Sequence, residues 1–122
     1  MLAVDSNVLV RFFVNDDVEQ ARRARRLVEE ASIYVCTTVW LETEWVLRST
    51  YKLRPPSILQ LLRAFAGLPS VTAEDPSRLA SALAAMERGV DFADALHLGG
   101  AVGCEAFVTF DRALERRAGG LW

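Results

Sequence analysis

Four acidic residues of this sequence lie in apolar surroundings, spread from one end of the chain to the other. Asp5 follows the apolar run 2–4, and Asp111 follows a second, mainly apolar run at 106–110. Glu42 lies among Trp, Leu and Val residues, and Asp94 lies among Phe, Ala and Leu residues. Carboxylates in such places need a compensating positive charge. We therefore expect Asp5, Glu42, Asp94 and Asp111 to form one acidic, cation-binding site.

The chemistry of such a site follows from the repulsion between its carboxylates. Two carboxylates about 4 Å apart repel each other by about 4 kcal/mol at an effective dielectric constant of about 20, so a cluster of four needs a bound cation. Oxygen ligands without His or Cys favour Mg²⁺ or Mn²⁺ over zinc. Such an ion binds phosphate oxygens and makes a bound water more acidic, which is the chemistry of phosphodiester hydrolysis.

Other polar residues beside these acids could support the site. Asn7 and Thr109 each lie two positions from an acid and could orient a carboxylate or a water, or they could serve as turn and cap residues. Asp91 could cap a helix that begins just before Asp94. The sole histidine, His97, has no Ser or Cys triad context, and we expect it to pack against the core, with a donor role as the alternative.

Each acid also has a structural alternative. Asp5, Asp94 and Asp111 could be helix caps or first-turn acids, which stabilise helix N-termini. Glu44 has Arg48 four residues later, the favourable order for an exposed ion pair, whereas Glu42 has no local cation and is expected to face inward. A shared inward placement of four acids is what favours a site.

The elements that would position these acids alternate between strand and helix. Short apolar or β-branched runs at 2–5, 32–36, 71–72 and 106–109 indicate strands. Helices are expected at 8–14, from the capping residues 15–17 to about 31, and from 37 or 38 to 51. Further helices are expected at 57–66, from 76 to Gly89, from Asp91 to about 103, and at 111–118. This alternation predicts an α/β fold with helices flanking a short parallel sheet of four or five strands, in a single domain at 1–122.

Composition limits the class of protein. The chain has 122 residues, 52% of them hydrophobic and 25% charged, which is typical of a soluble globular domain with a core. The high apolar share suggests a homodimer. No apolar run reaches the roughly 18 residues of a membrane span, and no leader is evident, so a cytoplasmic location is expected. Cys36 and Cys104 are expected to be buried, reduced thiols.

The basic residues are thirteen arginines and one lysine, Lys52. Arginine forks suit phosphate or carboxylate contacts, so this bias fits RNA or an acidic partner, although high genomic GC content would also produce it. The net charge of −2 argues against nucleic-acid binding over the whole surface. The arginines of the helix before Ala31 are interpreted as a solvated face, with an RNA-binding track as the alternative.

Several motifs together resemble the PIN-domain ribonucleases, and more narrowly the VapC-like toxins of bacterial toxin–antitoxin pairs. They are residues 4–10, Leu41-Glu42, residues 91–98 and residues 109–111, and they span nearly the whole chain in the same order. The resemblance implies a PIN-like three-layer fold, Mg²⁺- or Mn²⁺-dependent cleavage of RNA, dimerisation and inhibition by a small antitoxin protein. It assigns the acidic quartet to Asp5, Glu42, Asp94 and Asp111. Such proteins often carry another strand after the last helix, and none is evident at 119–122.

The alternative to an enzyme is a catalytically inactive PIN-fold module that acts by protein binding through its Trp- and Leu-rich helices. Metal-dependent nuclease activity would distinguish the two.

Overall fold

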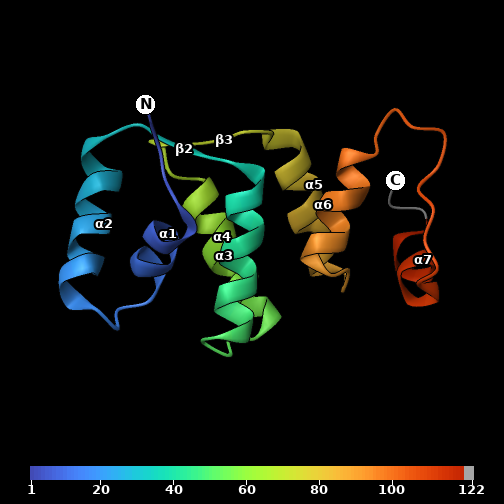
Figure 1. The fold of residues 1–122 in the computed structure, drawn as a ribbon, viewed down its shortest axis with the longest axis horizontal. Helices are drawn as coiled ribbons and strands as arrows, with labels where there is room; N and C mark the ends of the chain where they lie inside the picture. Colours follow the sequence, from blue (N-terminus) through green and yellow to red (C-terminus); the bar gives the residue numbers. More distant parts are fainter. Residues whose placement is uncertain (120–122) are drawn as a thin grey trace. The chain divides into compact units, whose positions relative to one another are not determined.

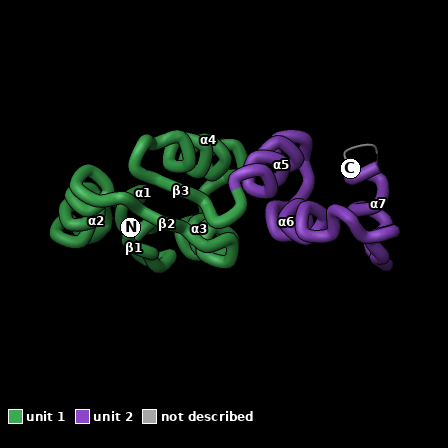
Figure 2. The backbone as a smooth tube through the Cα atoms, turned by 90° about the horizontal axis from the view of Figure 1, so that it is seen from above, with its two compact units in different colours: residues 1–75 green, residues 76–122 purple. Residues whose placement is uncertain are grey.

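The computed structural model describes residues 1–119 and contains a short sheet and many helices (Figure 1). The elements follow in the order β1 (Leu2–Ala3), α1 (Ser6–Phe13), α2 (Val18–Glu30), β2 (Ile33–Val35), α3 (Thr37–Ser49), α4 (Pro55–Ala66), β3 (Val71–Ala73), α5 (Pro76–Glu87), α6 (Phe92–Gly100) and α7 (Arg112–Ala118). Residues 1–75 form one compact unit and residues 76–122 a second, coloured separately in Figure 2. We call them unit 1 and unit 2.

The sheet lies in unit 1 and its strands are parallel. The strand order is β1-β2-β3; Leu2 pairs with Ile33, and Ile33 pairs with Val71. Parallel strands direct their carboxyl ends to the same edge of the sheet, where α/β folds place their sites. The predicted α/β class with a short parallel sheet is confirmed, with three strands in residues 1–119 instead of four or five.

The predicted strand at 106–109 was wrong. These residues have no regular secondary structure, and Phe107 and Val108 are 40% and 83% exposed. A strand needs a neighbour to satisfy its N–H and C=O groups, and within residues 1–119 this segment pairs with none. Residues 120–122, the end of the region in which no further strand was expected, lie outside the described part of the chain.

Local signals explain most helix boundaries. Pro76 begins α5 and Asp91 caps α6 as predicted, and Gly89 with φ +93° follows the end of α5. α4 begins at Pro55, two residues earlier than predicted, because proline's fixed φ and missing N–H suit a first helical turn. α6 ends at Gly100, three residues earlier than predicted.

The start of α3 depends on a residue from elsewhere in the chain. Thr37 or Thr38 was expected to cap this helix, but its N-cap residue is Cys36, which makes no side-chain cap hydrogen bond. Instead, Thr37 N donates to Glu74 Oε1 over 2.9 Å, so the residue after β3 supplies the acceptor. This contact ties α3 to the edge of the sheet where β2 and β3 end.

An aromatic cluster forms part of the unit 1 core. The ring of Phe65 in α4 lies 5.0 Å from that of Phe12, 5.5 Å from Phe13 and 5.9 Å from Trp40, all edge to face. Phe65 and Trp40 are each 1% exposed. The cluster joins α1, α3 and α4, and such aromatic pairs add to the free energy of burial.

Unit 2 is built on the packing of α5 against α6. Arg78 of α5 donates from Nε to Leu96 O over 2.8 Å, and its side chain passes close to Gly99 and Gly100. A Cβ at Gly100 would lie 2.6 Å from Arg78 Nη2, so a larger residue there would displace the end of the Arg78 side chain. Arg117 of α7 donates to Gly89 O over 3.1 Å and so connects α7 to the turn between α5 and α6.

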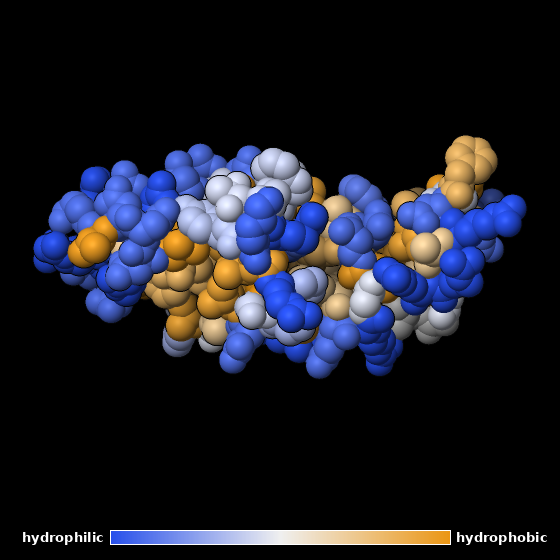
Figure 3. Space-filling model, turned by 90° about the horizontal axis from the view of Figure 1, so that it is seen from below, coloured by the Kyte–Doolittle hydropathy of each residue, from blue (hydrophilic) through white to orange (hydrophobic). Residues whose placement is uncertain are grey.

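The outer face of α2 is polar, and Figure 3 shows mainly hydrophilic residues at its end of unit 1. Arg22 lies 3.2 Å from Glu19, and Arg26 lies 3.5 Å from Glu30, with all four side chains exposed. Exposed pairs of this kind contribute little to stability. All four arginines of α2 are exposed, as predicted for a solvated face, and two of them form these ion pairs.

A hydrogen-bond network holds the loop between α1 and α2. Asp16 accepts from Tyr51 Oη over 2.8 Å and from Arg11 Nη1 over 3.1 Å. The Tyr51 hydrogen bond, and next the charge of Arg11, lower the pKa of Asp16 below its ordinary value of 3.8. The network joins this loop to the residue two positions beyond the end of α3.

This network predicts a pH effect on stability. Because the pKa of Asp16 is lower in the folded chain than in the unfolded chain, its contribution is fully present above the unfolded value and is lost as pH falls through the folded value. We expect the free energy of unfolding to fall less steeply below about pH 4 in Asp16→Asn than in the wild type, measured by urea titration at several pH values. Glu29→Gln, which removes an exposed acid elsewhere, should keep the wild-type slope; equal slopes for Asp16→Asn and the wild type would contradict the prediction.

The cysteines are free, as predicted, but the expectation of burial was wrong. Cys36 is half-buried and Cys104 is exposed. Cys104 lies in the irregular segment after α6, which packs little against its surroundings. Among the described residues, no helix is long and apolar enough to cross a membrane.

Candidate active site

Asp5 occupies the predicted position directly beyond β1. It is the N-cap residue of α1, and its Oδ1 accepts a hydrogen bond from Ser6 N over 2.7 Å. The side chain is exposed. Asp5 can therefore cap α1 and also serve in a site, because Oδ1 accepts the capping hydrogen bond while the carboxylate remains exposed to solvent.

Ser6 connects Asp5 to the distant Glu42. The Ser6 hydroxyl donates a short hydrogen bond to Glu42 Oε1 and lies 3.5 Å from Asp5 Oδ1. Ser6 and Glu42 are 36 positions apart, and Ser6 is only 8% exposed. Two of the predicted acids thus meet at one buried hydroxyl at the carboxyl edge of the sheet. Sequence analysis missed Ser6, although its place directly after a strand-end acid was a usable signal.

The two glutamates of α3 have the opposite environments to those predicted, which were a buried Glu42 and an exposed Glu44. Glu42 is exposed, whereas Glu44 is 2% exposed and lies 2.8 Å from Arg48 Nε. The predicted Glu44–Arg48 pair is confirmed, but its surface location was wrong. The buried face of α3 contains Trp40, Thr43, Glu44 and Leu47 at helical spacing, and Glu42 falls outside it.

Within residues 1–119, neither carboxylate of the Asp5–Glu42 pair forms an ion pair with an arginine or a lysine. Ser6 supplies hydrogen bonds but no charge. Two neighbouring carboxylates of this kind are a suitable environment for a divalent cation.

Unit 2 contains the other two predicted acids. Asp91 is the N-cap residue of α6 and accepts from Asp94 N over 3.1 Å, as predicted. Asp94 is half-buried; burial raises its pKa above the ordinary value, the charges of Asp91 and Asp111 raise it further, and His97 acts in the opposite direction. Asp94 and Asp111 are therefore close enough to interact electrostatically.

Asp111 begins α7 as its N-cap residue. Its Oδ1 accepts from Leu114 N over 3.1 Å, and its backbone N–H donates to Thr109 Oγ1 over 3.0 Å. Thr109 thus contacts the backbone of Asp111 rather than its carboxylate, which is the turn role considered for it. His97 is exposed, so the expectation that it packs in the core was wrong.

Residues 2–120 match the family model described as the PIN domain. The chain belongs to the PIN domain family. None of the curated proteins compared with it matches.

PIN domains are generally nucleases, hydrolases that act on nucleic acids, and they typically bind divalent metal ions. In the described residues, no three Asp, Glu, His or Cys side chains group closely enough to hold a metal ion. The Asp5–Glu42 pair nevertheless fits Mg²⁺, because that ion often binds through one or two carboxylates and completes its shell with waters and substrate phosphates. Asp5 and Glu42 lie in unit 1, and Asp94 and Asp111 lie in unit 2.

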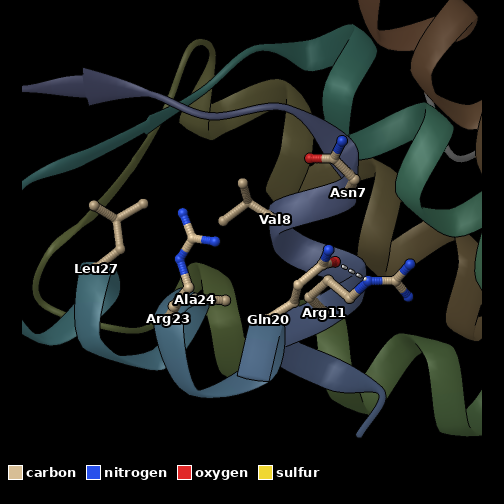
Figure 4. A pocket seen from close by; sticks show the side chains of 7 residues that line it. All are labelled: Asn7, Val8, Arg11, Gln20, Arg23, Ala24 and Leu27. Carbon is tan, nitrogen blue, oxygen red and sulfur yellow. Dashed lines mark hydrogen bonds between the residues drawn. The ribbon is translucent and has the colours of Figure 1, made fainter. Parts of the chain in front are cut away.

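Asn7 lies one residue beyond Ser6, in the first turn of α1. Its side chain is exposed, and it lines a pocket between α1 and α2 (Figure 4). In the described residues it makes no side-chain contact with Asp5 or Glu42 that would orient either carboxylate. Its position beside the acidic pair makes it a candidate for contact with a substrate.

Proposed function

We propose that this chain is a metal-dependent endoribonuclease that hydrolyses RNA phosphodiester bonds, with Asp5, Glu42, Asp94 and Asp111 as ligands of Mg²⁺ or Mn²⁺. One observation supports it above the others: Asp5 and Glu42 meet at the Ser6 hydroxyl and lack a cation partner among residues 1–119, in a member of a nuclease family. Oxygen-only ligands favour these ions over zinc.

The residues of the chain have separate tasks in this proposal. Ser6 donates to Glu42 and holds that carboxylate beside Asp5, while the Ser6 N–H fixes the rotamer of Asp5 through Oδ1. Both carboxylates are thereby oriented before any ligand binds, which reduces the cost of assembling the site. When bound, the divalent ion would make a water more acidic and offset the charge that develops on the phosphate.

The wider role that we propose is that of the toxin in a toxin–antitoxin pair. The motifs around Asp5, Glu42, Asp94 and Asp111 resemble VapC-like toxins, and this supports a small antitoxin protein as partner. We also propose a homodimer, a single domain and a cytoplasmic location, which fit the apolar composition and the soluble character of the sequence. Asn7, Thr109 and Asp91 are proposed as supporting residues.

A second function is favoured by the exposed apolar residues of unit 2. Val102, Val108 and Phe110 are 74%, 83% and 101% exposed, and Trp45 in unit 1 is 55% exposed. Exposed apolar side chains in one segment are typical of protein-binding surfaces. A catalytically inactive PIN-fold interaction module is therefore the alternative.

A cleavage assay distinguishes these functions. Single-stranded RNA incubated with the wild-type chain should be cut with Mg²⁺ or Mn²⁺ and remain intact with EDTA. Asp5→Asn should cut at least about 100-fold more slowly, because loss of a residue that merely supports a metal ligand already costs about 10–100-fold. Asp17→Asn is a matched control: Asp17 is the N-cap residue of α2, and asparagine caps as well as aspartate. RNA cleavage by Asp5→Asn at the wild-type rate, or in EDTA, would refute the metal-dependent enzyme.

A further inference from the structure

A pocket of about 400 Å³ lies between α1 and α2 in unit 1 (Figure 4). Val8, Ala24 and Leu27 provide its apolar surface, and Asn7 and Arg23 are among its polar residues. Figure 4 shows the Arg23 guanidinium directed into the space between α2 and Val8. The volume lies in the range of small-molecule binding sites, about 300–1,000 Å³.

The charge of this pocket is positive. Its lining contains two arginines, Arg11 and Arg23, and no aspartate or glutamate. Arg11 is already engaged, because it donates to Gln20 Oε1 over 2.7 Å and lies 3.1 Å from Asp16 Oδ1. In residues 1–119, Arg23 has no ion pair, in contrast to Arg22, which lies 3.2 Å from Glu19. Arg23 is therefore the uncompensated cation of the pocket.

One residue of the pocket lining, Asn7, is close along the chain to the acidic pair. Asn7 lines the pocket and directly follows Ser6, whose hydroxyl contacts Glu42. A ligand that contacts Asn7 in the pocket would thus lie at the first turn of α1, two residues along the chain from Asp5.

We propose that this pocket binds one nucleotide of the RNA substrate next to the cleaved phosphodiester. This inference rests on the nuclease function proposed above. Arg23 donates to a phosphate oxygen, the apolar side chains of Val8 and Leu27 contact the base, and the Asn7 amide is free to bond the ribose or the base edge. Charge complementarity favours this occupant over an apolar peptide helix, because an apolar helix would leave the Arg23 guanidinium without a partner.

The test measures RNA binding without cleavage. A fluorescein-labelled single-stranded RNA of about ten nucleotides is titrated with the full chain in EDTA, at several salt concentrations between about 50 and 200 mM. Arg23→Ala should weaken binding by about 3- to 10-fold and reduce the slope of log K against log [salt] by about 0.7, the value for one phosphate contact to a single strand. Arg25→Ala is the matched control, since Arg25 lies on the same helix, is exposed and does not line the pocket.

Two results would overturn the pocket assignment. Arg23→Ala could bind RNA with the wild-type affinity and salt slope, as expected if the pocket receives a peptide. Alternatively, Arg23→Ala and Arg25→Ala could weaken binding equally, which would mean that only net charge matters. Cleavage by the wild-type chain with Mg²⁺ is measured in parallel, so a failure of the nuclease function is separated from a failure of the pocket.

Discussion

Replacing Glu42 with glutamine is expected to lower the rate of RNA cleavage at saturating Mg²⁺ by at least about 100-fold. Glutamine has the same shape and can still accept the Ser6 hydroxyl hydrogen bond through its amide oxygen, so the local geometry should persist. It removes the negative charge that makes the Asp5–Glu42 pair suitable for a divalent cation. Because Glu42 is exposed, the free energy of unfolding should change by no more than about 0.5 kcal/mol.

Two companion variants make this prediction specific to the site. Glu29→Gln removes an exposed acid from α2, far along the chain from Ser6, and should cleave at the wild-type rate. Ser6→Ala keeps both carboxylates but removes the hydroxyl between them, and it should have an intermediate effect of about 10- to 100-fold, mainly through weaker Mg²⁺ activation. The proposal fails if Glu42→Gln and Glu29→Gln have the same activity.

Replacing Phe65 with alanine is expected to lower the free energy of unfolding of unit 1 by about 3–5 kcal/mol. Phe65 is 1% exposed and contacts three aromatic rings from α1 and α3, so its removal leaves a cavity that these rings cannot fill. The Trp40 ring lies 5.9 Å away and contributes to the tryptophan fluorescence that follows unfolding in a urea titration.

The control for this variant lies on the same helix. Gln60→Ala changes an exposed residue of α4 and should alter the free energy of unfolding by no more than about 0.5 kcal/mol. A loss below about 1.5 kcal/mol for Phe65→Ala would mean that the aromatic cluster is not the stabilising core of unit 1.

The sequence alone was sufficient for the order and type of the helices and for the three strands that form. Pro76, Gly89 and the N-cap acids Asp91 and Asp111 were each predicted, because caps and breakers act through hydrogen bonds and backbone angles a few residues away. The strand-end position of Asp5 followed from the same local pattern. The motifs that resemble PIN-domain ribonucleases led to the family to which the chain belongs.

The local sequence pattern was insufficient where burial or strand formation depends on contacts with distant parts of the chain. Which α3 glutamate is buried depends on the surfaces that pack against the helix, and the Arg48 pair made burial of Glu44 possible. The apolar run 106–109 resembles a strand, but a strand also requires a partner, and that requirement concerns the whole fold.

The amino-acid sequence thus determined which acids exist, which follow strands and which can cap helices, since these properties involve neighbours along the chain. Tertiary structure decided that the Ser6 hydroxyl joins Asp5 to Glu42 and that Arg23 points into a pocket that Asn7 also lines. Contacts between residues 36 positions apart arise from the packing of α1 against α3, and no local pattern encodes them.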